Sequence, residues 1–379
     1  MPNSSRIAWI DEFKGLVLLL VCIFHVDQHF QNIDIGSFHL TCLRMAAFFF
    51  ISGVLFSDRR FPKFKDYFVH KTKVLLLPYV SLSFLFLLLD PVIYNFDLYP
   101  KALKTQMFFQ PVLCDSVWKY IAVNLENVFV EGKGTLMAST LWFVSTLYFI
   151  SLIFYLLQKF ATWISVKSLH ENVVKNSVIG FVAAASFTAG YVMCLHKIHL
   201  PLGVERNLST LFYFALGFMC KGALKHCNAF AGSKFKWSLP CIATVCFVAY
   251  AFLKDPSPWR GFYNNNISLL LLASSIFGIA GLIALMSFLS GFKGKPVQVL
   301  LGVLRCVSRN GLIVLTVHFW TLITLKILFK QFFDRPVIAY SVYLIVAVVT
   351  FAAITLFRCK LYWLLGKERV STKESLSIK

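Results

Sequence analysis

Long apolar stretches separated by short polar segments run along almost the whole chain. About ten of them approach the 20 or so residues with which a helix crosses a bilayer while satisfying its own backbone hydrogen bonds. They cover residues 15–32, 38–57, 74–94, 141–158, 177–195, 207–221, 237–253, 267–292, 308–329 and 336–357. Asp90 and Pro91 interrupt the third stretch, so nine or eleven spans also fit. The pattern predicts an all-α polytopic membrane protein with about ten transmembrane helices.

The distribution of charge predicts how these spans are oriented. The chain is 58% hydrophobic and 14% charged, and its net charge is +20. The loop between the first two predicted spans has no Lys or Arg, whereas residues 57–73 hold a basic cluster: Arg59, Arg60, Lys63, Lys65, Lys71 and Lys73. Because basic loops stay in the cytoplasm, this bias predicts that both termini are cytoplasmic. The lipid bilayer explains the positive charge, and no nucleic-acid partner is needed.

The domain organisation is simple. Residues 1–358 are expected to form one integral-membrane domain with an outer-side loop at about residues 96–140, whose aromatic content suggests a folded cap or an interfacial helix. Residues 359–379 are expected to be a flexible cytoplasmic tail. The ten cysteines lie mostly inside spans and form no CxxC pair, so they indicate neither a disulfide framework nor a zinc site.

The first span carries the ionisable residues of most interest. Lys14 precedes its apolar run and His25 lies eleven residues later, about 16 Å along a helix, which places His25 near the middle of a bilayer. An ionisable group at that depth is a functional-site hypothesis, although a packed histidine bonded to a carbonyl explains it equally well. Asp11 and Lys14 share a helical face and can form a local ion pair. His29, one turn past His25, has no evident carboxylate or cysteine partner, so no metal site is predicted.

Five motifs in order along the chain resemble the integral-membrane acyltransferase 3 family. Residues 9–15 (WIDEFKG) with His25 resemble its first-helix signature, in which a basic residue is followed after ten positions by a histidine. The other matches are residues 44–53 (RMAAFFFISG), 71–79 (KTKVLLLPY), 141–144 (LWFV) and 308–312 (SRNGL) with His318. Ala46 replaces the proline of the second motif and Gly311 the serine of the last. Lys14 stands where many members have arginine, and lysine cannot form arginine's bidentate fork.

The resemblance implies a function. Lysine at position 14 is similar to the branch of fucose 4-O-acetylase-type sugar O-acetyltransferases. Such an enzyme of the bacterial inner membrane moves an acetyl group from cytoplasmic acetyl-CoA to a carbohydrate hydroxyl of a cell-envelope or exported glycan, with acetyl-CoA as donor substrate and no permanently bound cofactor. The implied residues are His25, Asp11 and Lys14 for catalysis, Lys14, Lys71 and Lys73 for acyl-CoA binding, and Arg44, Trp142 and His318 for contact with the acceptor or the acyl carbonyl.

Several alternatives stay open at this point. His25 can act as a general base or as a covalent acyl carrier. Trp142 suits an interfacial aromatic belt as well as a sugar-stacking surface, and Ser52 and Gly53 suit close helix packing. The rival class is a transporter of a glycan precursor or small metabolite, but the sequence has no paired repeats with broken helices at matching positions.

The charge bias gives a direct test of topology. A reporter that is active only in the cytoplasm should work when fused at Lys379 or within residues 59–65, and should fail within residues 101–110. Reporter activity can be assayed in intact cells. Activity at residues 101–110 would overturn the orientation and the direction of acyl delivery.

Overall fold

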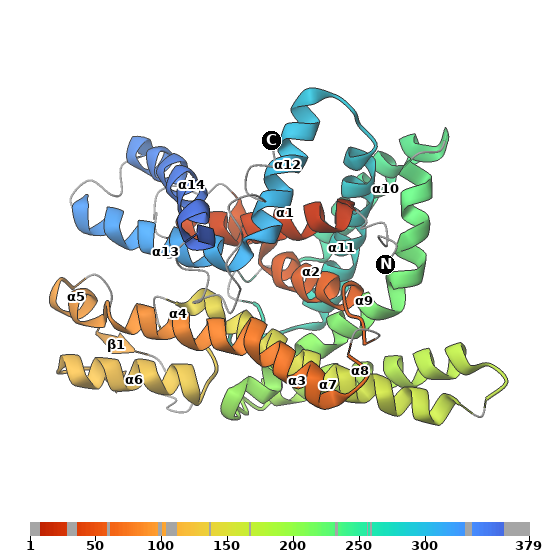
Figure 1. Ribbon diagram of the computed structural model, residues 1–379, viewed down its shortest axis with the longest axis horizontal. Coiled ribbons are helices and arrows are strands. Elements are labelled where there is room, and N and C mark those ends of the chain that lie inside the picture. The colour runs from red at the N-terminus through yellow and green to blue at the C-terminus, as the bar shows by residue number, and fades with distance from the viewer. Residues whose placement is uncertain are drawn as a thin grey trace.

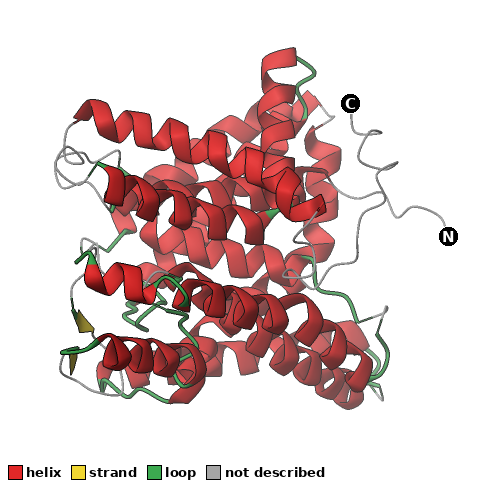
Figure 2. Ribbon diagram, turned by 60° about the vertical axis from the view of Figure 1, so that its left-hand side comes forward, coloured by secondary structure: helices red, strands yellow, loops and turns green. Residues whose placement is uncertain are grey.

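Helices make up nearly all of the described chain (Figures 1 and 2). The computed structural model describes residues 8–28, 36–58, 61–97, 101–103, 112–135, 138–166, 168–231, 234–255, 257, 260–329 and 336–359. Its α-helices are α1 Ala8–Asp27, α2 Thr41–Val54, α3 Phe64–Lys71, α4 Leu77–Leu87, α5 Asp90–Asn95, α6 Val117–Phe129, α7 Trp142–Ser165, α8 Glu171–Leu195, α9 Val204–Ala231, α10 Ser238–Leu253, α11 Leu269–Ser290, α12 Lys295–Arg309, α13 Gly311–Leu328 and α14 Pro336–Cys359.

Short elements connect these helices. Four are single 3₁₀ turns: η1 Ser37–Leu40, η3 Ser139–Leu141, η4 Pro201–Gly203 and η5 Lys234–Trp237. The π-helical turn η2 Thr72–Leu76 joins α3 to α4, so that the three form one long helical run. β1 Ala102–Leu103 pairs antiparallel with β2 Val112–Leu113 at one edge of the molecule (Figure 2).

Among the described residues, seven helical runs are long and apolar enough to cross a membrane: Ser37–Val54, Phe64–Asn95, Ser139–Ser165, Glu171–Leu195, Leu269–Ser290, Gly311–Leu328 and Tyr340–Phe357. The remaining three predicted spans fall on α1, α9 and α10. Charged residues lie at both ends of α1, Glu205 lies in the first turn of α9, and α10 has only 16 residues. The chain is therefore a polytopic helical protein, while the count of ten and the orientation of the termini remain predictions.

The structure refines several predicted boundaries. The interruption at Asp90 is real, because α4 ends at Leu87 and α5 begins at Asp90. The described part of the predicted outer-side loop contains α6, which packs on α4 and α5. α12 occupies a segment that the apolar pattern left between two spans, and its buried residues Leu301, Leu304 and Val307 form a stripe that packs on α1. His29 and residues 360–379 of the predicted tail lie outside the described residues.

α1 and α2 lie inside the helical assembly. α1 packs against α2, α11, α12 and α13, and α2 also packs against α9 and α11. In Figure 1, the α13–α14 pair lies at one end of the molecule and the α10–α11 pair at the other, while α3, α4, α7 and α8 run across the lower part. Both termini of α1 consequently face side chains from helices that are distant in the sequence.

Reciprocal glycines set the closest approach of α2 and α9. A Cβ at Gly53 would come within 1.9 Å of the Phe214 carbonyl oxygen, and a Cβ at Gly217 would come within 1.9 Å of the Phe50 carbonyl oxygen. The predicted packing role of Gly53 is confirmed, and its counterpart on α9 is Gly217. Small residues permit this contact because the two backbones themselves touch.

This contact predicts a difference between two glycines of the same helix. Gly217→Ala should lower the free energy of unfolding by about 3 kcal/mol or more, because the obstructing atom is backbone and cannot move aside. Gly222→Ala is the matched control, since its Cβ would meet nothing within 4 Å and alanine favours the helix. Thermal unfolding of the purified proteins in detergent measures both, and equal midpoints would contradict the packing assignment.

Candidate active site

Two cavities share the Phe143 side chain as part of their lining. One has a volume of about 200 Å³ and is lined by Lys14, Phe48 and residues 308–313. The other has a volume of about 300 Å³ and is lined by His25, Arg44, Trp142 and residues 260–264. Of the described lining residues, Phe143 alone belongs to both. We call them the Lys14 cavity and the His25 cavity.

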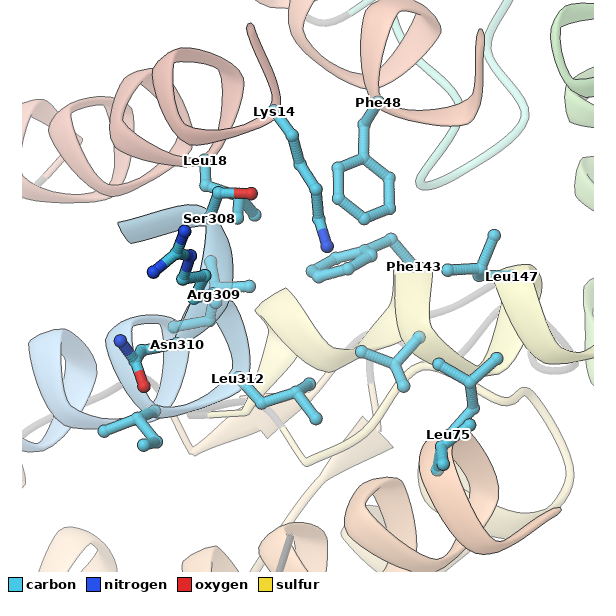
Figure 3. A pocket seen from close by; sticks show the side chains of 15 residues that line it. Lys14, Leu18, Phe48, Leu75, Phe143, Leu147, Ser308, Arg309, Asn310 and Leu312 are labelled. Carbon is cyan, nitrogen blue, oxygen red and sulfur yellow. The ribbon is translucent and has the colours of Figure 1, made fainter. Parts of the chain in front are cut away.

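α1 connects the two cavities. Lys14 lies in its first half and His25 in its last turn, so the continuous helix separates the two residues by about 16 Å along its axis. In Figure 3 the Lys14 side chain extends from α1 toward the rings of Phe48 and Phe143. His25, which the sequence placed at mid-membrane, lies close to the end of α1 that faces residues 260–264.

A tight helix contact places α12 beside Lys14. A Cβ at Gly15 would come within 1.9 Å of the Leu304 carbonyl oxygen, so α1 and α12 touch through their backbones. On the same side, Arg305 Nη1 donates to Glu12 Oε1 at 2.8 Å, and Glu12 is only 1% exposed. Together these contacts bring Ser308 and Arg309 to the wall of the Lys14 cavity (Figure 3).

The other residues that the sequence analysis assigned to the donor or to catalysis differ in their distance from the Lys14 cavity. Lys71, on α3, is close enough to Lys14 for the two positive charges to repel, and its Nζ lies 5.3 Å from the centroid of the Tyr67 ring. Lys73 is exposed and lines neither cavity. Asp11 is 5% exposed on α1 and also lines neither cavity. Arg309 lines the cavity although the predicted site did not include it.

The imidazole of His25 has a defined environment. Its Nδ1 lies 3.1 Å from Gln28 Oε1, within hydrogen-bonding distance of this amide oxygen. The ring centroid is 5.8 Å from that of His318 and 4.8 Å from that of Phe319. His318 Nδ1 donates to the Val314 carbonyl oxygen at 2.9 Å. The structure thus brings together two histidines that lie far apart in the sequence.

Arg44 is fixed at the start of α2. It is 3% exposed; its Nη1 donates to the Ser37 carbonyl oxygen at 2.6 Å and its Nη2 to Thr41 Oγ1 at 3.2 Å. The guanidinium carbon lies 3.8 Å from the centroid of the Phe24 ring, and the Ser37 hydroxyl donates to Asp27. Arg44 therefore presents a fixed positive charge to the His25 cavity.

Residues 260–264 form a wall that was not identified from the sequence. Arg260, Tyr263 and Asn264 line the His25 cavity together with Trp142, and the Trp142 and Tyr263 rings are 6.0 Å apart. The available signal was the clustering of aromatic and amide residues in a short segment between two spans. Among the described residues, no group of three or more His, Cys, Asp or Glu side chains is arranged to hold a metal ion.

Comparison with known proteins identifies the family. The family model of the acyltransferase domain matches residues 7–358, which is nearly the whole chain. No curated protein and no solved structure matches it. The chain belongs to the acyltransferase 3 family and is a membrane acyltransferase, as the five sequence motifs indicated.

The ion pair between half-buried Arg305 and buried Glu12 holds α12 against α1 and can be tested by mutation. Arg305→Leu should lower the free energy of unfolding by about 2 to 3 kcal/mol, because it leaves the Glu12 carboxylate buried without its cation. The double variant Glu12→Gln with Arg305→Leu should recover part of this loss. Lys295→Leu, an exposed change on the same helix, is the control. Thermal unfolding in detergent measures the effect, and a single-variant midpoint equal to that of the control would contradict it.

Proposed function

We propose that the protein transfers an acetyl group from cytoplasmic acetyl-CoA to a carbohydrate hydroxyl of a cell-envelope or exported glycan. The observation that carries this proposal is the pair of cavities along α1, one lined by Lys14 and the other by His25, which share Phe143 as a lining residue. In this arrangement donor and acceptor approach from opposite ends of one helix. The fucose 4-O-acetylase-like branch, the bacterial inner membrane and the cytoplasmic termini belong to the same proposal.

The Lys14 cavity suits an acyl-CoA donor. Coenzyme A carries several phosphate charges, and Lys14, Lys71 and Arg309 provide cations from three different helices around or beside this cavity. Lys14 acts as a point charge, and Arg309 adds a guanidinium that can grip a phosphate bidentately. Lys73 and Asp11 act from farther away, Lys73 on the solvated end of the donor and Asp11 on the orientation of the first turns of α1.

The His25 cavity suits a sugar acceptor. Its volume lies at the small end of the range for ligand pockets, which favours a single sugar residue. The Trp142 ring offers a flat apolar surface, while Gln28 and Asn264 offer amide donors and acceptors for hydroxyl groups. This combination of one aromatic surface and several neutral polar groups supports a carbohydrate more than a purely apolar substrate.

The chemistry follows from the environment of His25. With Nδ1–H bonded to Gln28, the Nε2 lone pair takes the proton of the sugar hydroxyl as its oxygen attacks the thioester carbonyl carbon. The carbon–sulfur bond then breaks, and the coenzyme A thiolate receives the proton. The fixed charge of Arg44 polarises the acyl carbonyl oxygen. His318 supports His25 or shares its proton. A covalent acyl-imidazole on His25 is the competing route.

His25 is the residue on which the mechanism depends. His25→Ala should lower acetyl transfer by at least about 10²–10⁴-fold while membrane abundance stays near normal, because general-base catalysis contributes that much. His170→Ala, on an exposed connection, is the matched control, and His29→Ala should be mild. The measurement is acetylated envelope glycan by mass spectrometry, in cells making each variant and in a deletion strain. Normal acetylation by His25→Ala would remove its chemical role, and an unchanged glycan profile with altered solute uptake in the deletion strain would favour a transporter.

Lys14 gives a separable prediction for the donor side. Lys14→Ala should raise the KM for acetyl-CoA with little change in the KM for the acceptor, because it removes a charge from the donor cavity only. Lys14→Arg should keep part of the activity, since the positive charge survives. Initial rates at varied acetyl-CoA concentration measure this. An equal rise in both KM values would contradict the assignment of Lys14 to the donor.

A further inference from the structure

Arg206 is a fully buried guanidinium that none of the assigned roles uses. It lies in the first turn of α9, and its side chain has 0% exposure. Nε donates to Thr146 Oγ1 at 2.9 Å, and Nη1 donates to the Tyr263 carbonyl oxygen at 3.3 Å. Nη2 donates to the carbonyl oxygens of Glu131 and Gly132 at 3.1 and 3.4 Å. A single side chain thus joins α7, the segment after α6 and the segment before α11.

Two of these three segments, α7 and the segment before α11, contribute lining residues to the His25 cavity. Tyr263 lines it, and Thr146 lies one turn along α7 from Trp142, which lines it as well. The guanidinium carbon of Arg206 lies 5.4 Å from the centroid of the Trp142 ring. Arg206 therefore contacts two walls of the cavity without lining it.

The backbone is shaped to admit this side chain. Gly132 and Gly203 adopt left-handed conformations with φ of +64° and +60°, and a Cβ at Gly203 would come within 2.4 Å of Arg206 Nη2. Burying a guanidinium is costly, and the carbonyl oxygens and nearby Glu131 and Glu205 charges offset that cost. A lysine lacks the planar fork needed to reach three segments at once.

A second buried cation supports the same wall. Lys133 Nζ lies 3.0 Å from Glu131 Oε2 and donates to Asn264 Oδ1 at 3.2 Å, and both charged side chains are 4% exposed. Burial lowers the pKa of Lys133 to about 8, so it remains mostly charged at neutral pH. Asn265, next in the chain, is anchored independently by Ser209 and by the Gly190 carbonyl oxygen. Contacts with α8, α9 and the segment after α6 thus hold the segment 260–266 in place.

We propose that Arg206 is a positioning residue for the acceptor: it holds Trp142 and residues 260–264 in the arrangement that binds the sugar beside His25. This inference rests on the proposed function, because it assigns the acceptor to the His25 cavity. Arg206 itself touches no substrate. Its loss acts on acceptor binding and on the orientation of the hydroxyl, and leaves the Lys14 cavity intact.

Kinetics of the purified full-length protein separate this role from a general structural one. The donor is acetyl-CoA, and the acceptor probe is envelope glycan prepared from the deletion strain. Arg206→Lys should raise the acceptor KM by about tenfold or more, and Thr146→Val, which removes one hydrogen bond, by a few-fold, because small misplacements of binding groups are costly. The KM for acetyl-CoA should stay within about twofold for both variants. Thr210→Val is the control, since Thr210 bonds only main-chain carbonyls of its own helix.

Hydrogen–deuterium exchange provides a readout that needs no substrate. Arg206→Lys should speed exchange in residues 260–266, whose amides of Gly261, Asn265 and Asn266 are hydrogen-bonded within the loop, and leave α12 unchanged. Faster exchange with a selective rise in acceptor KM supports the inference. Unchanged exchange, or equal changes in both KM values, overturns it. If the wild-type protein shows no transferase activity, the proposed function is refuted. The hydrogen–deuterium exchange result would still decide whether Arg206 holds residues 260–266 in place.

Discussion

The fixed distance between Lys14 and His25 on one continuous helix is the constraint on which the account depends. α1 is regular from Ala8 to Asp27, so neither residue can approach the other, and each lines its own cavity. A donor held by its phosphates near Lys14 must extend its acyl arm along the helix to reach His25. The cavities meet at Phe143, which lines both of them. In the proposed function, the geometry of an α-helix therefore separates recognition of the donor's charge from the chemistry.

A different device stabilises the surroundings of each cavity. At the Lys14 end, backbone contact at Gly15 and the Glu12–Arg305 pair hold α12 in place. Around the His25 cavity, Arg206 joins α7, the segment after α6 and the segment before α11. Both devices use a buried or half-buried arginine bonded to groups from another segment. Changes at one end should therefore leave the substrate of the other end largely unaffected.

The sequence predicted the parts of the fold and site that depend on local spacing. The apolar runs located most of the long helices, because a spanning helix needs about twenty apolar residues in succession. Lys14 and His25 could be selected as candidates because they share one predicted helix. α12 was missed because its apolar residues form only one stripe among polar ones, which lowers its average hydropathy below that of a span.

The sequence analysis missed other residues around the two cavities for a different reason. Arg206 lies at the edge of a predicted span, and most of its partners are backbone carbonyls, which carry no residue-specific signal. Asn264 lines the cavity and accepts a hydrogen bond from Lys133, more than a hundred positions earlier in the chain. The pairing of His318 with His25 likewise depends on how α13 packs against α1. Such contacts are fixed by tertiary packing.

The central claim is that the donor enters at the Lys14 cavity and the acceptor at the His25 cavity, on opposite sides of the membrane. The most direct measurement uses sealed inside-out vesicles with deacetylated glycan enclosed and radiolabelled acetyl-CoA added outside. The account predicts that label accumulates on the enclosed glycan, and that right-side-out vesicles treated in the same way remain unlabelled. Equal labelling in both orientations, or label found only on glycan added outside the inside-out vesicles, would contradict it.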